Sequence, residues 1–172
     1  MRASVGSENV PLFLTSAYFV IERVIRKLDD PQRQGGYFSV FDVEGAKIGS
    51  PLVSILVGDL PEAKTREKLE FSHEKAIRLA GHLNEGHLSS FQSKDEENGK
   101  WPGAVLIKGY FGDLDGARIF SFSGLPPAWD EAAMLLVGTS AHLIAPSGAK
   151  EIADISRNDV FFRIRPRWHA YG

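Results

Sequence analysis

The histidines are the side chains of this sequence whose chemistry can be argued most directly from spacing; they are His73, His82, His87, His142 and His169. His73 shares a helical stripe with Leu69 and Ile77, so we expect it to face a sheet or a cleft beside one. An imidazole in that place is either a buried neutral ring held by one hydrogen bond, or a ligand or proton-transfer group. Spacing alone leaves both interpretations open.

A metal site built from these histidines depends on how the chain turns. His82 lies nine residues beyond His73, about half a turn around a helix, so the two cannot bind one metal ion from the same helix face. His82 and His87 can meet only if the chain folds back after Gly86. The absence of cysteine excludes disulfides, thiol catalysis and thiolate zinc sites. His73, His82 and His87 are therefore the candidate metal ligands, and the metal itself is unknown.

Common catalytic and nucleotide-binding signatures are missing from the chain. It has no GxGxxG, no GxxxxGK followed by Ser or Thr, and no HExxH. The stretch Ser121–Gly124 lacks the first glycine of a GxSxG nucleophile elbow. The charged run Pro61–Arg78 is typical of a solvated helix face, with Glu70 and Glu74 near Arg66 and near Lys75 or Arg78.

The elements that must position these side chains follow from hydrophobic periodicity and turn residues. Helices are expected at 14–28, 61–83 and from 127 onward, strands at 37–42, 52–57, 104–111, 117–123 and 160–165, a long loop at 84–102 and a hairpin turn at 113–116. Strand pairs joined by short turns imply an antiparallel sheet. The order α-β-β-α-β-β-α plus a C-terminal strand-like extension predicts an α+β fold with the sheet flanked by helices.

Composition sets the outer limits on function. The chain has 172 residues, of which 43% are hydrophobic and 24% charged, which predicts one globular domain. Within it we expect a lead-in at 1–13, a core at 14–145 and an extension at 146–172. A net charge of -2 argues against a nucleic-acid partner, and the basic cluster Arg163–His169 is better explained by a charged edge strand or an oligomer contact. Without an 18-residue apolar run or a secretion signal, we expect no membrane partner and a cytoplasmic location.

Two blocks of the chain resemble a known family. One runs from Phe41–Gly45 through the strand 52–57 to Ser72–Ala76, and the other joins Asp115–Ile119 to Ser123–Glu131. Together they are similar to the D-x-x-G turn, the A-x-x-K-A helix and the S-G-x-x-P-x-x-D-E stretch of the GlcG / PduO C-terminal / HbpS-like proteins. The chain differs from that pattern at Val57–Leu60 and Pro102–Val105. The resemblance implies a profilin-like sheet flanked by helices in a homo-oligomer that binds haem or a corrinoid.

The residues expected to contact such a small-molecule ligand are His73, Lys75, Ser123, Gly124 and Asp130, with Phe71, Phe91 and Trp101 as apolar walls. The leading hypothesis is a non-enzymatic binding domain. A small enzyme that uses His73 with Glu74 or Asp130 as an acid–base pair is the alternative, and a structural or regulatory subunit is a third. Gly124, Pro127 and Asp130 also suit a tight strand-to-helix turn without any ligand.

Overall fold

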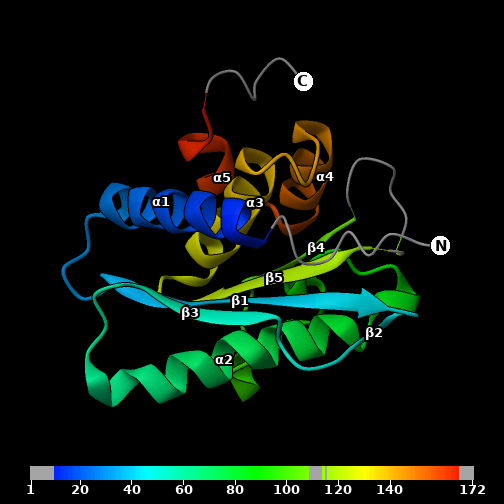
Figure 1. Cartoon of the computed structure of the whole chain (residues 1–172), viewed down its shortest axis with the longest axis horizontal. Helices are drawn as coiled ribbons and strands as arrows, with labels where there is room; N and C mark the ends of the chain where they lie inside the picture. The colour runs from blue at the N-terminus through cyan, green and yellow to red at the C-terminus, as the bar shows by residue number, and fades with distance from the viewer. Residues whose placement is uncertain (1–9, 109–113, 115, 167–172) are drawn as a thin grey trace.

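The sheet is organised around β1 (Gly35–Glu44), which pairs with three of the other described strands. The computed structural model describes residues 10–108, 114 and 116–166. β3 (Val53–Gly58) and the short β2 (Lys47–Ile48) pair along one edge of β1, β5 (Arg118–Ser123) pairs along the other, and β4 (Ala104–Ile107) pairs with β5. Every one of these pairings is antiparallel (Figure 1), as the short turns predicted.

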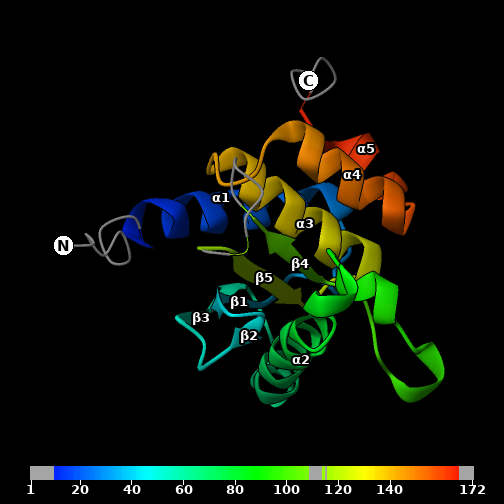
Figure 2. The same ribbon diagram turned by 90° about the vertical axis from the view of Figure 1, so that its right-hand side faces the viewer.

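Helices cover both faces of this sheet (Figures 1 and 2). α1 (Val10–Leu28), α3 (Pro127–Ser140), α4 (Pro146–Ser156) and α5 (Asp159–Ile164) lie on one face. Among the α-helices of the described residues, α2 (Glu62–Ala80) alone covers the other face. The predicted α+β class with a helix-flanked antiparallel sheet is therefore confirmed.

Side chains of the central strands alternate between these two helical layers, as a pleated strand requires. The larger core, against α1 and α3, takes Phe38, Phe120 and Phe122 from β1 and β5. The smaller core, against α2, takes Phe41 and Ile119 from the same two strands. The same two strands thus supply side chains to both cores, and the core against α2 contains fewer buried apolar residues.

The C-terminal part of the described chain is helical, so the strand predicted at 160–165 is wrong. α4 has Pro146 in its first turn, and Asn158 caps α5 by accepting a hydrogen bond from Phe161 N at 3.0 Å. The run of Val, Phe and Ile favours a strand locally. Phe161 and Ile164 nevertheless both enter the larger core from one helix face, and this tertiary packing decides the outcome.

Several other boundaries differ from the predicted ones. α1 begins at Val10 inside the expected lead-in, and β2 was not predicted. The expected loop 84–102 holds 3₁₀ turns at Leu83–Glu85, Ser90–Ser93 and Glu96–Asn98. The hairpin turn expected at 113–116 and the basic cluster at 163–169 fall partly outside the described residues. No helix in the described part of the chain has the length and apolarity needed to cross a membrane.

Candidate functional site

A pocket of about 340 Å³ opens where the end of β5, the start of α3 and the middle of α2 meet. The segment before β1 contributes Arg33, and α2 contributes Lys68, Phe71, Glu74 and Lys75. Gly99 and Trp101 come from the loop after α2, and Ser123, Gly124, Leu125, Pro127 and Asp130 come from the β5–α3 junction. The lining therefore combines flat aromatic walls with charges of both signs.

A buried ion pair lies at this pocket. Lys75 Nζ donates to Asp130 Oδ2 at 2.7 Å and to the Phe122 carbonyl at 2.9 Å. The Lys75 side chain is only 4% exposed and that of Asp130 only 2%. Asp130 Oδ1 accepts from Leu125 N at 2.8 Å, so both carboxylate oxygens are engaged. The pair joins the α2 layer to the first turn of α3 across the end of β5.

Burial controls the charge of Asp130. Removal of the carboxyl from water raises the pKa of Asp130 to about 6, against the opposing effect of the Lys75 ammonium and the hydrogen bonds from Lys75 and Leu125 N. A carboxyl with such a pKa changes its protonation state close to neutral pH. Ionisable groups whose pKa values are shifted by a pocket are typical of binding and catalytic sites.

Two glycines make the site possible. A Cβ on Gly124 would lie 2.2 Å from the Gly35 carbonyl oxygen, so only glycine lets the β5–α3 turn approach the start of β1 so closely. Gly103 has a φ of +141°, and a Cβ there would lie 2.7 Å from Lys75 Nζ. The absence of a side chain at Gly103 thus leaves space for the ammonium group of Lys75.

The structure brings together four of the five expected ligand-binding residues. Lys75, Ser123, Gly124 and Asp130 all line the pocket, whereas His73 is not part of its lining. His73 Nε2 lies 2.8 Å from Ser54 Oγ, and its ring packs edge-on against Phe41 with centroids 5.5 Å apart. Burial lowers the pKa of His73, which favours the neutral ring.

A row of serines under α2 was missed by the sequence analysis. Ser54, Ser39 and Ser121 lie directly opposite one another on β3, β1 and β5. Ser39 Oγ is 2.9 Å from Ser54 Oγ and accepts from Ser72 Oγ of α2 at 3.0 Å, while Ser121 Oγ donates to the Ser72 carbonyl at 2.6 Å. With His73 at one end, this row forms a continuous polar seam between α2 and the sheet. The presence of a serine within each of three predicted apolar strands was the available signal.

Arg78 fixes the loop that carries Trp101. Its guanidinium donates to the carbonyls of Ser90 (2.6 Å), Ser93 (2.9 Å) and Trp101 (2.6 Å), and its Nε donates to Glu74 at 2.9 Å. The exposed pair of Arg66 with Glu70, at 2.9 Å, is the solvated-face contact that the charge pattern indicates. Arg78 therefore does more than the pattern indicated, because it ties α2 to the loop.

Glu131, next to Asp130, serves a different part of the molecule. Its carboxylate accepts from Ser89 Oγ of the loop, Ser156 Oγ of α4 and Asn158 Nδ2 at the start of α5. Burial raises the pKa of Glu131 against these hydrogen bonds. Phe91, expected as a pocket wall, lines a neighbouring hollow that includes Glu131, while Phe71 and Trp101 line the main pocket.

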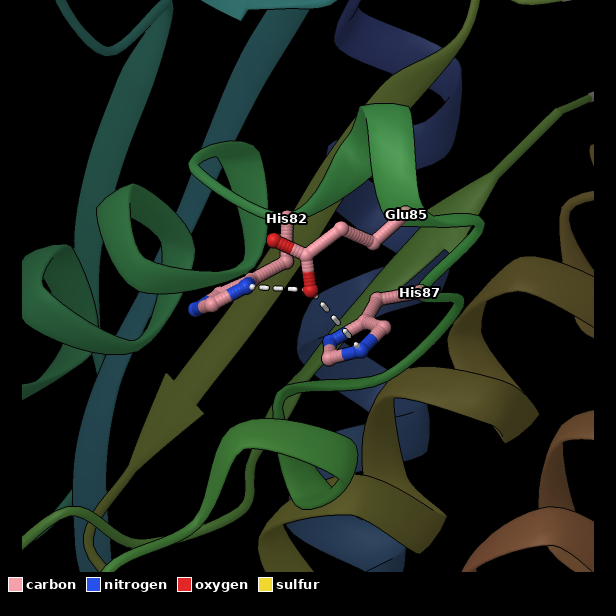
Figure 3. Close-up of side chains that lie close together, drawn as sticks. All are labelled: His82, Glu85 and His87. Atoms are coloured by element: carbon pink, nitrogen blue, oxygen red, sulfur yellow. Dashed lines mark hydrogen bonds and ion pairs between the residues drawn. The ribbon is translucent and has the colours of Figure 1, made fainter.

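The remaining expected residues, His82 and His87, come together away from the pocket. The chain does fold back after Gly86, and the two rings stack with centroids 4.8 Å apart beside Glu85 (Figure 3). His73 does not join them, since it is hydrogen-bonded to Ser54.

Comparison of the chain with protein-family models, with curated proteins and with solved structures finds no match.

Proposed function

We propose that the protein is a small-molecule-binding domain and that the pocket at Lys75 and Asp130 binds a small planar organic anion. The observation that carries this proposal is the balance of charge in the lining. Both carboxylates already have cationic partners, Asp130 in Lys75 and Glu74 in Arg78 at 2.9 Å and Lys100 at 3.4 Å. Arg33 lines the pocket and takes part in none of the ion pairs found among the described residues, so its charge is available to a ligand.

Hydrogen-bond counting supports an anionic group beside Lys75. An ammonium has three N–H donors, and two of those of Lys75 go to Phe122 O and Asp130. The third has no protein acceptor within the described chain, and Lys75 lines the pocket. A carboxylate that accepts from Lys75 and from the planar guanidinium of Arg33 satisfies both cations.

Shape and size support a flat ligand. Phe71 and Trp101 provide apolar walls, and 340 Å³ lies at the small end of the usual range for ligand pockets. A tetrapyrrole with carboxylate side chains is a larger member of the same chemical class. Haem iron takes axial ligands from His, Met, Cys or Tyr, and the lining contains none of these. The pocket therefore fits a small carboxylate better than an axially ligated haem.

The test is a calorimetric titration with benzoate and an absorbance titration with haemin. We expect saturable benzoate binding that weakens about 10-fold or more in Arg33→Gln, because a charge-assisted hydrogen bond is lost. Arg66→Gln is the matched control, since Arg66 is an exposed cation of α2 outside the lining. Binding should also weaken as the pH rises past about 6, because Asp130 then gains a negative charge.

Three results would contradict the proposal. The first is the absence of saturable benzoate binding, and the second is benzoate binding that Arg33→Gln leaves unchanged. The third is a haemin Soret shift that is lost in His73→Ala and kept in Arg33→Gln, which would place the ligand at the serine seam instead.

A second candidate function is proton transfer by Asp130, favoured by its raised pKa inside a pocket. The expected pairing of His73 with Asp130 has no support in the geometry, because His73 bonds to Ser54 and Asp130 to Lys75. Both oxygens of Asp130 are already engaged by Lys75 and Leu125 N, and for this reason we favour binding over catalysis.

A further inference from the structure

We propose that His82, Glu85 and His87 form a binding site for one divalent transition-metal ion of the Zn²⁺ type. The three residues lie within a six-residue turn at the end of α2, and their ligand atoms all fall within 4.8 Å of one another. The site is separate from the pocket, because none of the three residues belongs to its lining. The proposal is therefore independent of the anion-binding function.

Backbone geometry, rather than side-chain flexibility, brings the two rings together. His82 immediately precedes the 3₁₀ turn Leu83–Glu85, whose Glu85 N donates to His82 O at 3.1 Å. Gly86 follows with a φ of +79°, a left-handed conformation that glycine adopts without strain. His87 N then donates back to His82 O at 3.3 Å, which closes the turn and stacks the rings at an interplanar angle of 16°.

The separations of the two imidazoles from the Glu85 carboxylate are close to those that a tetrahedral ion requires, within a cluster whose ligand atoms all lie within 4.8 Å of one another. His82 Nδ1 lies 3.1 Å from Glu85 Oε2, and His87 Nε2 lies 3.7 Å from the same oxygen. For Zn–N and Zn–O bonds of about 2.0–2.1 Å, tetrahedral geometry separates neighbouring ligand atoms by about 3.4 Å. Figure 3 shows one oxygen of the Glu85 carboxylate directed toward both rings, so an ion could contact all three residues after small side-chain shifts.

Burial selects which nitrogen of His87 is available. His87 Nδ1 is buried and has no hydrogen-bond partner among the described residues, whereas Nε2 is directed toward Glu85. The Glu85 side chain is 62% exposed, so water can reach the cluster and complete the coordination. Two imidazoles and one carboxylate with an open position form a donor set that suits Zn²⁺, Ni²⁺ or Cu²⁺ better than Mg²⁺ or Ca²⁺.

A bound ion would connect the end of α2 to the segment that pairs with β4. Leu88, the residue after His87, accepts a hydrogen bond from Leu106 N of β4 at 2.8 Å. The ion would therefore hold the first residues of the loop against β4 without touching the pocket. Because the ion would join two segments of the chain, its effect should appear as an increase in stability.

The test is a Co²⁺ titration of the full chain, followed by visible absorbance and then by competition with Zn²⁺. We expect one equivalent of Co²⁺ with a tetrahedral-type spectrum, displacement by Zn²⁺, and a rise in Tm with Zn²⁺ concentration. Affinity should fall about 100-fold or more in His87→Asn and clearly in Glu85→Gln, whose exposed side chain can be changed without unfolding the protein.

His142→Asn is the matched control, because His142 is exposed and its φ of +55° is one that asparagine tolerates. Retention of Co²⁺ binding in His142→Asn with loss in His87→Asn supports the site. The proposal is overturned if wild-type protein takes up no Co²⁺, if His87→Asn binds as tightly as wild type, or if His142→Asn loses binding equally. Circular dichroism of each variant separates ligand loss from misfolding.

Discussion

The two faces of the sheet are made from the same strands but contain different chemistry. On the α1–α3 face, Phe120 contacts the rings of Phe38 and Phe13 at centroid distances of 5.6 and 5.7 Å. On the α2 face, Ser121 of the same strand enters a polar seam, and Lys75 is buried against Asp130. Apolar packing has no directional requirement, whereas each buried polar group needs a partner. The α2 face is therefore where a missing partner can be supplied by a ligand.

The largest expected effect tests whether the α2 layer depends on its ion pair. Asp130→Ala should lower the free energy of unfolding by about 3–5 kcal/mol, because it leaves the Lys75 ammonium buried and unpaired. Urea denaturation measures this change. The double variant Lys75→Met with Asp130→Leu should recover most of the stability and yet lose benzoate binding.

That pair of variants separates stability from function on the α2 face. A double variant that remains as unstable as Asp130→Ala would contradict the explanation, because it would show that the loss comes from packing around α3. A double variant that still binds benzoate would remove Lys75 from the site.

A smaller effect is expected in the serine seam. Ser39→Ala should cost about 1–2 kcal/mol, because Ser54 and Ser72 lose the hydroxyl that they share. The control Ser147→Ala changes an exposed serine of α4 and should leave stability within about 0.5 kcal/mol of wild type. Equal costs for the two substitutions, measured by urea denaturation, would show that the seam contributes no directional stability.

Glu131, the neighbour of Asp130 in α3, allows a test of how stability depends on pH on the α1–α3 face of the sheet. Its pKa is raised in the folded state, so its contribution to stability is present below the ordinary value of 4.5 and is lost as the pH rises through the raised pKa. Glu131→Gln does not titrate and can retain contacts with Ser156 and Asn158. Relative to this variant, wild type should become less stable with rising pH. A difference in unfolding free energy that stays constant with pH would contradict this expectation.

The smallest effect is expected on the solvated face of α2. Arg66→Gln breaks an exposed pair with Glu70 and should change stability by less than about 0.5 kcal/mol. The same measurement on Arg78→Gln should give a clearly larger loss, because Arg78 donates to three loop carbonyls. Similar losses for the two arginines would mean that the loop is held by other contacts.

The sequence predicted the sheet and most helices because their periodicity is local. Alternation along 37–42 and 117–123 and the helical stripe of 61–83 each depend on neighbouring residues only. The segment at 160–165 could not be predicted in the same way, because its branched and aromatic residues favour a strand until the core is known. The Asn158 cap was the overlooked local signal.

The candidate site was predictable only in part. Lys75, Ser123, Gly124 and Asp130 come from two blocks of sequence whose contact depends on the sheet register, and the resemblance rather than periodicity identified them. His73 faces the sheet, as its helical stripe predicted, but the stripe does not show which part of the sheet it faces, and the residue lies outside the pocket lining. The role of Arg78 depends on the path of a long loop, which no periodic pattern specifies.

The contacts of Arg78 also have a consequence for how the native protein opens. One guanidinium joins the carbonyls of Ser90, Ser93 and Trp101 to α2, so loss of its contacts would free these three points of the loop from α2 together while the strands stay paired. Such partial opening requires less free energy than global unfolding. The amide protons of the loop should therefore exchange with solvent sooner than those of β1 and β5. Release of the loop would also withdraw Trp101 from the pocket while Lys75 and Asp130 remain paired.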